Sequence, residues 1–343
     1  MSKILTVNPG STAVKYTLFD TTGNVLEVQE YSRKEVDGVQ SDESKWLERL
    51  EDVTSIGIRI VHGGSITKPR EIDMEVLSEI KGAQDYAPLH NNIAVDVIWA
   101  LRKHLQNIPI VAVFDTEFHS TLPEHAYTYP IPAALAHELE LRRYGFHGIA
   151  LKSVLAQVPE VAARKGTPMP RKVIMLHLGG GSSITAVDSG KSVDTTMGLT
   201  PLEGIMMITR SGSVDPDLLR IIAKKKFLPQ QEVSQILNEQ SGFYGLTGSK
   251  DTEDIITRAA SGEEPYKLAV DIFVHQTVKQ IFAYYGLLQG ADALTFSGGI
   301  GFGNEYLRTR ILEKTKLIGL TEENSFVLQS NEAKEIFETV TNL

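Results

Sequence analysis

Residues 3–20 read KILTVNPGSTAVKYTLFD, and this stretch decides the fold. An apolar, β-branched run ends in a polar turn that holds proline, glycine and hydroxyl residues, and apolar alternation resumes at Val14. A second turn, Thr22-Gly23-Asn24, precedes Val25. The pattern predicts a strand, a glycine turn, a strand, a second turn and a third strand.

The same order of elements returns in residues 172–195. Val173–Leu176 is apolar, a glycine and serine turn follows at Gly179–Ser183, and Ile184–Val187 resumes the strand. A third apolar segment, Ala293–Phe296, also leads into glycines. Two loop-bearing hairpins about half a chain apart indicate a duplicated architecture.

The stretches between these hairpins carry apolar residues at helical spacing. We expect one helix capped by Asn91 and Asn92, and a second helix from Tyr266 to Leu288. The basic segment 159–171 is rich in proline and glycine, so we expect an exposed loop there. Strands and helices mixed in this order predict an α/β fold.

Composition limits the classes of function. A length of 343 residues suggests two domains, at ~100–200 residues each. The net charge of -9 argues against nucleic acid or an anionic membrane as a partner. The absence of cysteine excludes disulfides and thiolate catalysis. With no apolar run of the ~18 residues that a bilayer requires and no signal-peptide pattern, we expect a cytoplasmic protein.

Glycine-rich turns follow three of the apolar strands. Because glycine has no Cβ, backbone amides in such turns can approach a phosphate closely. A plain hairpin is the alternative interpretation of each turn. Hydroxyl residues beside the glycines of the first two turns favour phosphate binding, because a plain hairpin does not need them.

Two arginines lie among apolar or glycine residues. Arg59 is within the strand-like run Ile58–Val61, and Arg210 follows the apolar segment Ile205–Ile208. A buried arginine costs free energy unless it is paired, so each position predicts a bound anion, with a structural salt bridge as the alternative. The planar guanidinium suits both carboxylate and phosphate.

Asp115, His119 and His147 complete the candidate set. Asp115 follows the predicted strand Ile110–Val113, which is a common position for a functional carboxylate in α/β folds. A lone histidine is more often structural than catalytic, and the nine histidines are scattered. The chain shows no metal-ligand spacing such as H-E-x-x-H and no defensible Ser-His-Asp arrangement.

Several ordered segments can be compared with known families. They are Asn8–Ser11, Arg59–Gly64, Ala87–Asn91, Phe114–His119, Arg143–Gly148, Lys191–Thr195, Met197–Gly204 and Thr209–Gly212. Read together, they resemble the acetate kinase family, within the larger sugar kinase, Hsp70 and actin superfamily. The resemblance implies a duplicated, ribonuclease H-like fold with a central cleft. It also implies an N-terminal domain of residues 1–116 plus 333–343 and a C-terminal nucleotide-binding domain of residues 117–332.

The resemblance implies an activity as well. A member of this family would transfer a phosphoryl group reversibly from ATP to acetate, directly and in line, giving acetyl phosphate and ADP. It would use Mg²⁺, with Mn²⁺ as the alternative, and would form a homodimer. Propionate or butyrate as acceptor, GTP or pyrophosphate as donor, a non-catalytic binding relative and a bare ATPase are the alternatives.

Residue roles follow from the same resemblance. Arg59 and Arg210 would bind the carboxylate and the transferring phosphoryl group, His147 would donate a hydrogen bond to that group, and Asp115 would orient the site. The substrate pocket would be lined by Val61, Leu89, Phe146 and Pro201. The phosphates and nucleotide would contact Ser11, Lys15, His177, Gly179, Gly180, Gly181, Asp251, Gly299 and Gly301. The metal ion would bind Asn8 and Glu332.

The chain departs from the family pattern mainly on the nucleotide side. The family's Asp-aromatic-Arg segment at the adenosine site reads Asp251-Thr252-Glu253 here, and the usual asparagine of the second phosphate loop is Gly180. The other departures are Ala13 in the first loop, Ile149-Ala150-Leu151 after the Phe-His-Gly motif, and Phe302 after the third glycine turn. These changes concern the phosphoryl donor more than the reaction.

Overall fold

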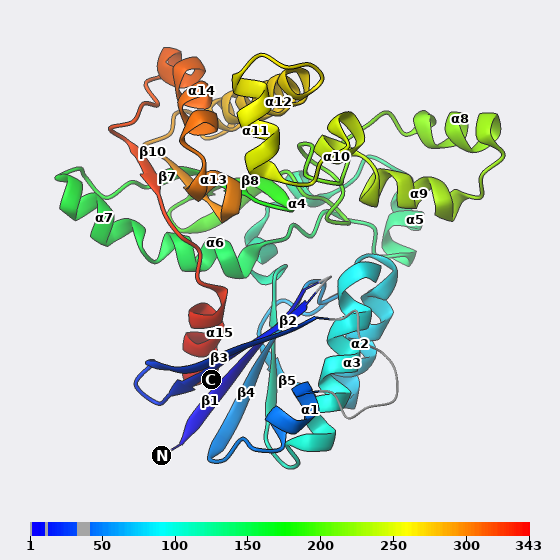
Figure 1. The fold of residues 1–343 in the computed structure, drawn as a ribbon, viewed down its shortest axis with the longest axis vertical. Coiled ribbons are helices and arrows are strands. Elements are labelled where there is room, and N and C mark those ends of the chain that lie inside the picture. The colour runs from blue at the N-terminus through cyan, green and yellow to red at the C-terminus, as the bar shows by residue number, and fades with distance from the viewer. Residues whose placement is uncertain (1, 11–12, 33–41) are drawn as a thin grey trace. The chain divides into compact units, whose positions relative to one another are not determined.

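The computed structural model describes residues 2–10, 13–32 and 42–343, except the side chains of residues 88 and 89. The chain forms two compact units (Figure 1). The first comprises Met1–Ser120, Phe146–Ser153 and Asn331–Leu343, and the second comprises Thr121–Gly145 and Val154–Ser330. The assignment of nucleotide binding to a C-terminal domain stays a prediction.

The first unit is built on a mixed sheet with strand order β3-β2-β1-β4-β6-β5. The strands are β1 (Lys3–Pro9), β2 (Ala13–Asp20), β3 (Val25–Ser32), β4 (Val53–Ile60), β5 (Arg70–Glu71) and β6 (Ile110–Phe114). Strands β1, β2 and β3 form the predicted antiparallel meander, whereas β1, β4 and β6 run parallel. The carboxyl ends of three neighbouring strands therefore meet at one edge of the sheet.

Both faces of this sheet are covered, as the alternation of side chains along each strand requires. Helices α2 and α3 pack on one face against residues such as Leu5 and Ile58, and α15 packs on the other against Ile4 and Val111 (Figure 1). The helical segments are α1 (Asp42–Leu47), α2 (Met74–Gly82), η1 (Ala83–Asp85), α3 (Pro88–His104), η2 (Glu117–Thr121), the start of α6 (Gly148–Leu155) and α15 (Glu332–Thr341).

The second unit contains a five-stranded sheet with strand order β11-β10-β7-β8-β9. Its strands are β7 (Lys172–Leu178), β8 (Ser182–Asp188), β9 (Lys191–Thr195), β10 (Ala293–Ser297) and β11 (Ser325–Val327). Strands β7, β8 and β9 form an antiparallel meander, and β7, β10 and β11 are parallel. Apart from β5, the two units share one topology, so the predicted duplicated α/β fold is confirmed.

Helices account for most of the rest of the second unit. They are α4 (Glu124–Tyr127), α5 (Ala133–Glu138), α7 (Val158–Lys165), α8 (Asp217–Lys226), α9 (Gln230–Glu239), α10 (Gly242–Thr247), α11 (Thr252–Ala260), α12 (Tyr266–Leu287), α13 (Gly298–Gly303), α14 (Glu305–Thr315) and η3 (Lys316–Ile318). The predicted long helix from Tyr266 is confirmed as α12, which packs into the core beside β7 and β8.

Three local predictions are wrong. Segment 159–171 is not a loop throughout, because α7 occupies Val158–Lys165. Its proline lies in the first turn, where no backbone N–H is needed, and Gly166 ends the helix in a left-handed conformation. The helix predicted to begin at Asn91 begins at Pro88, so Asn91 lies within it. The third glycine turn forms the short helix α13.

Candidate functional site

Arg59 and Asp115 form a buried ion pair at the carboxyl ends of the parallel strands in the first unit. Arg59 lies on β4, and Asp115 directly follows β6. Nε and Nη2 of Arg59 donate hydrogen bonds of 3.0 and 2.6 Å to Oδ2 of Asp115. The side chain of Asp115 is completely buried and that of Arg59 is 15% exposed. A pair this deep costs free energy in desolvation, so a structural role alone explains it poorly.

Asn8 and Glu332 extend this pair to a cluster of four side chains. Nη1 of Arg59 donates to Oδ1 of Asn8 at 3.0 Å and lies 3.6 Å from Oε2 of Glu332. Nδ2 of Asn8 donates to the same glutamate oxygen. Asn8 lies near the end of β1 and Glu332 begins α15, so segments more than 300 residues apart in the chain supply neighbouring oxygen atoms.

The electrostatics of the cluster follow from its burial. Burial raises the pKa of Asp115 to about 6, although Arg59 opposes the shift and Glu332 adds to it. Burial acts against the charged guanidinium, yet Asp115 and Glu332 outweigh it and raise the pKa of Arg59 above its ordinary value. Arg59 therefore stays charged while Asp115 titrates within reach of neutral pH.

The oxygen donors of the cluster fit a magnesium ion. Mg²⁺ prefers one or two carboxylates and completes its shell with waters and substrate phosphates. Glu332 supplies a carboxylate beside the amide oxygen of Asn8. Within the described part of the chain, no group of three or more His, Asp or Glu residues could hold a metal ion alone. The donor set therefore suits a metal that arrives with a polyphosphate.

The first glycine turn is only partly described. Lys15 lies opposite Asn8 in the β1–β2 ladder, and directly opposed residues of an antiparallel pair present their side chains on one face. Ser11 lies outside the described residues, so its predicted phosphate contact stays a prediction. Gly10 donates its backbone N–H to the carbonyl oxygen of Ala13 at 2.8 Å.

His147 has a strained backbone beside Asp115. Its φ is +64°, a value that residues other than glycine rarely adopt. The next residue, Gly148, donates its N–H to the backbone oxygen of Asp115 at 2.8 Å, and a Cβ at this glycine would lie only 2.3 Å from that oxygen. This close approach fixes His147 next to Asp115, directly before α6 begins at Gly148.

Three of the four residues predicted for the acyl pocket, Val61, Leu89 and Phe146, belong to the first unit. Val61, directly after β4, and Phe146 are both buried. The carbonyl oxygen of Phe146 lies 2.9 Å from Nε2 of His119, and its ring lies 5.6 Å from that of His62. The side chain of Leu89 lies outside the described part, and Pro201 belongs to the second unit.

The second unit brings two glycine segments together. The turn Gly179–Gly181 joins β7 to β8, and Gly298 follows the parallel neighbour β10. Gly298 has a φ of +76°, and a Cβ there would lie 2.5 Å from the backbone oxygen of Leu178. By contrast, a Cβ at Gly180 or Gly299 would meet no described atom within 4 Å. The backbone at these two positions is open to a ligand.

His177 lies at the end of β7 beside this pair of segments. Its Nδ1 lies 3.1 Å from the hydroxyl oxygen of Ser297, the last residue of β10. Gly301 approaches the side chain of Leu178 from α13. The structure thus groups His177 with Gly179, Gly180, Gly299 and Gly301, all predicted to contact phosphate.

Arg210 lies in the loop between β9 and α8. Its Nη1 is 3.4 Å from the carbonyl oxygen of Pro201, and its own carbonyl oxygen accepts the backbone N–H of Met207 at 3.0 Å. A glycine on either side of the loop, Gly204 and Gly212, adopts a positive φ. Arg210 and Pro201 are therefore brought together within the second unit.

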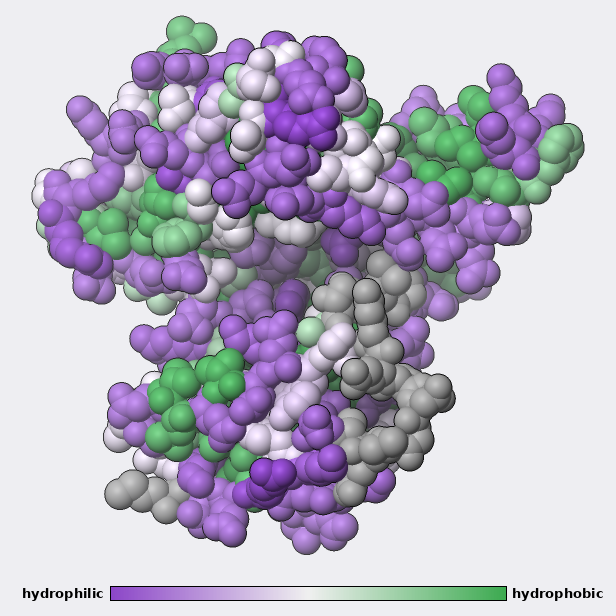
Figure 2. Space-filling model, in the orientation of Figure 1, coloured by the Kyte–Doolittle hydropathy of each residue, from purple (hydrophilic) through white to green (hydrophobic). Residues whose placement is uncertain are grey.

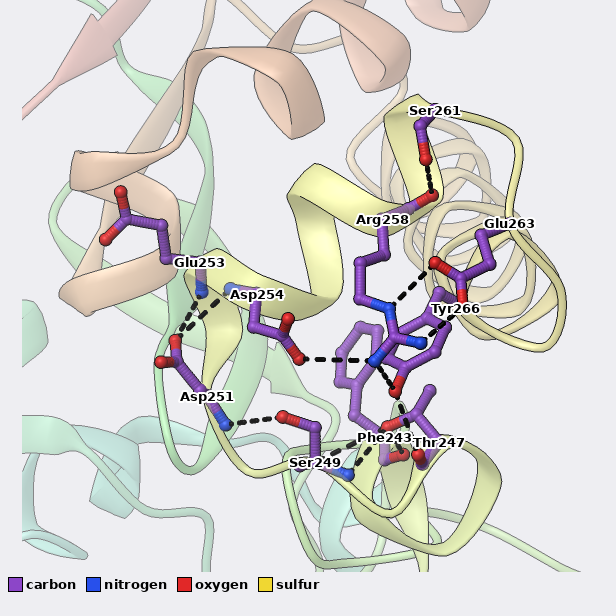
Figure 3. A network of polar contacts seen from close by, with 10 residues as sticks. All are labelled: Phe243, Thr247, Ser249, Asp251, Glu253, Asp254, Arg258, Ser261, Glu263 and Tyr266. Carbon is purple, nitrogen blue, oxygen red and sulfur yellow. Dashed lines mark hydrogen bonds and ion pairs between the residues drawn. The ribbon is translucent and has the colours of Figure 1, made fainter.

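Asp251 caps a helix in the second unit (Figure 3). Its carboxylate accepts hydrogen bonds from the backbone N–H groups of Glu253 and Asp254, so it is the N-cap of α11. Glu253 is exposed, and its carboxylate points away from the surrounding network in Figure 3. The arginine of this helix, Arg258, lies over the ring of Tyr266 and pairs with Glu263.

Sequence patterns missed several positioning residues. Asn91 is buried within α3, where its side chain accepts the N–H of His62 and donates to the His62 carbonyl oxygen at 2.8 Å. It thereby fixes the backbone that follows Val61. The feature of the sequence that could have indicated this role is an asparagine within an apolar helical pattern. The pattern instead predicts a helix cap at this asparagine. Ser297 beside His177 had no comparable signal.

Comparison with known proteins agrees with this geometry. A family model described as the acetokinase family matches residues 36–341. The acetate kinase of Bacillus mycoides is 37% identical over 93% of this chain and 88% of its own length. Two crystal structures each align over 99% of both chains: a propionate kinase from Francisella tularensis (33% identity, TM-score 0.89) and the acetate kinase of Porphyromonas gingivalis (29%, 0.84).

No described helix is both long enough and apolar enough to span a bilayer.

The breadth of the family match, the identity with curated relatives and the agreement of whole-chain folds all point the same way. This chain belongs to the acetokinase family, a family of kinases that transfer a phosphoryl group to a carboxylate.

Proposed function

We propose that this chain transfers a phosphoryl group reversibly between ATP and acetate, giving acetyl phosphate and ADP. The observation that carries the proposal is the buried cluster of Arg59, Asp115, Asn8 and Glu332 at the carboxyl ends of three parallel strands, in a chain of the acetokinase family. Phosphoryl transfer depends mainly on positioning and charge neutralisation, and this cluster supplies both.

The reaction needs no intermediate on the protein. An oxygen atom of acetate attacks the γ-phosphorus of ATP in line with the bond between that phosphorus and the leaving oxygen. This bond breaks as the new one forms, and ADP departs with the electron pair of the broken bond. Arg59 and Arg210 bind the carboxylate and the moving phosphoryl group, and His147 donates a hydrogen bond to that group. Such preorganised donors stabilise charge where it develops in the transition state.

The remaining residues position the reactants. Ionised Asp115 holds the guanidinium of Arg59 in orientation, and Asn8 with Glu332 would hold Mg²⁺, which would neutralise charge on the polyphosphate. Lys15, His177 and the open glycine backbones at Gly180 and Gly299 would contact the phosphates. Val61 and Phe146 would enclose the methyl group of acetate, together with Leu89 and Pro201.

A homodimer is part of the proposal. Helix α8 contains no buried residue, although its sequence is rich in leucine and isoleucine, and Phe227 at its end is 93% exposed. Figure 2 shows apolar surface over this helix and α9. Acidic Asp217 begins α8 and Lys224–Lys226 end it, so two copies packed antiparallel would bring opposite charges together. Replacing Phe227 with Ser should shift the mass measured by light scattering toward the monomer.

Trapping the product tests the proposed reaction. The protein is mixed with acetate, Mg²⁺ and ATP in the presence of hydroxylamine, which converts an acyl phosphate to a coloured hydroxamate. We expect hydroxamate that depends on all three reactants. Folded protein, checked by circular dichroism, that gives no hydroxamate with ATP, GTP or pyrophosphate would overturn the proposal.

A further inference from the structure

A groove between α12 and α14 is lined by none of the residues assigned to the reaction. It has a volume of about 580 Å³ and belongs wholly to the second unit. On α12 it is lined by side chains at helical spacing, from Lys267 through Asp271 to Lys279, and on α14 by Arg310 and Lys314. Figure 1 shows the two helices side by side, and they pack against each other.

The charge in this groove is strongly one-sided. Four cationic side chains and a single carboxylate line it, in a chain whose net charge is -9. Asp271 accepts hydrogen bonds from Lys267 at 2.5 Å and from Arg310 at 2.6 Å, and these bonds lower its pKa. The carboxylate of Asp271 on α12 therefore neutralises one end of the groove and binds Arg310 of α14 on the opposite wall.

The other end of the groove is not neutralised. Among the described residues, no carboxylate lies within ion-pair distance of Lys279 or Lys314. Arg310 and Lys314 are four residues apart on one helix, and like charges at that spacing repel each other. An anion bound in the groove would therefore be attracted by two lysines that no carboxylate of the described residues neutralises.

The chemistry of the lining indicates what the anion carries. The fork of Arg310, which suits planar carboxylates, is already engaged by Asp271. The lysines that are left are compact point charges of the kind that bind phosphate. Val274, Val278 and Phe282 give the groove an apolar floor between the cations. We propose that the groove between α12 and α14 binds a multiply charged phosphate-bearing anion.

Calorimetric titration with inorganic tripolyphosphate tests the site. Wild type is compared with the double variant Lys279→Gln/Lys314→Gln, and with a matched control, Lys68→Gln/Lys103→Gln, which removes two exposed lysines of the first unit and loses the same charge outside the groove. We expect two binding events in wild type and in the control, and loss of one event, or weakening by roughly tenfold or more, in the groove variant.

Catalysis provides an independent readout. Because the groove contains no residue of the proposed reaction, the groove variant should keep the wild-type kcat with acetate and ATP. The same isotherm in wild type and the groove variant would overturn the proposal, as would an equal loss in the control variant of the first unit, which would indicate a general charge effect. If the protein binds tripolyphosphate in the groove but makes no acetyl phosphate, the groove proposal stands and the proposed function is wrong.

Discussion

Two arginines with acidic partners, one in each unit, are held in very different ways. Arg59 is buried and bonds to Asp115 and Asn8, which come from distant parts of the chain. Arg258 is partly exposed and pairs with Glu263, five residues further along the same chain segment. The first arrangement is costly and needs a whole fold to assemble it, whereas the Arg258–Glu263 pair joins near neighbours in the sequence at the surface, where an ion pair contributes little. The buried cluster thus depends on the whole fold, whereas Asp251 and Glu253 lie at an ordinary helix start.

The largest expected effect concerns the stability of the buried pair. Replacing Arg59 with Ala leaves the completely buried Asp115 without its partner, and breaking a buried pair in this way costs ~3–5 kcal/mol. Urea unfolding gives the free energy directly. The matched control, Arg164→Ala, removes an exposed partner of Glu160 and should leave stability nearly unchanged. Equal losses in the two variants would contradict the comparison.

The next largest effect should be on catalysis. Removing one preorganised donor to the transition state typically lowers kcat by ~10²–10³, or about 3–4 kcal/mol. We expect this loss for Arg210→Ala and for His147→Ala, measured by steady-state kinetics on protein with a native melting temperature. A kcat within about threefold of wild type would remove the residue from the mechanism.

Acceptor size should have a moderate effect. An extra methylene group changes transition-state binding by only ~1–3 kcal/mol in an apolar pocket. Propionate should therefore be a poorer substrate than acetate, and Val61→Ala should narrow the difference in kcat/KM. Val28→Ala, at an exposed position on the edge strand β3, serves as the control. Butyrate that outperformed acetate would show that the pocket residues are assigned incorrectly.

Acidity should affect activity and stability in opposite directions. Below pH 6, protonation of Asp115 neutralises the partner of Arg59, so kcat/KM should fall up to about tenfold per pH unit. The pKa of this group is raised from 3.8 by folding, so its contribution to stability is present below pH 4 and is lost as the pH rises through 6. A flat pH–rate profile down to pH 4.5 would contradict this assignment.

The smallest effect is expected on the donor side. Glu253→Arg restores a side chain that could stack on a base, which contributes ~0.5–1 kcal/mol at an exposed site. The preference for ATP over GTP should therefore rise a few-fold, measured as a ratio of kcat/KM values. Glu232→Arg, in the first turn of α9, is the matched control. No change in the ratio would mean that residues 251–253 do not set donor choice.

The sequence predicted what depends on local pattern. Alternation and glycine turns predicted both hairpins, and the position after a parallel strand predicted where Asp115 would lie. The sequence did not predict that Asn91 holds the chain at His62, because that contact depends on how α3 packs. Helix α7 was missed because its proline and glycine lie at the two ends of the helix, where they favour it. The partners of Arg258 likewise depend on the tertiary position of Tyr266.

One kinetic matrix tests the central claim most directly. Wild-type protein with Mg²⁺ is assayed with acetate and propionate, each in combination with ATP and GTP, and the four kcat/KM values are compared. The account predicts a clear preference for acetate with either donor, and ATP and GTP within about tenfold of each other, or ~1.4 kcal/mol. A thousandfold preference for ATP, combined with equal use of the two acids, would contradict it.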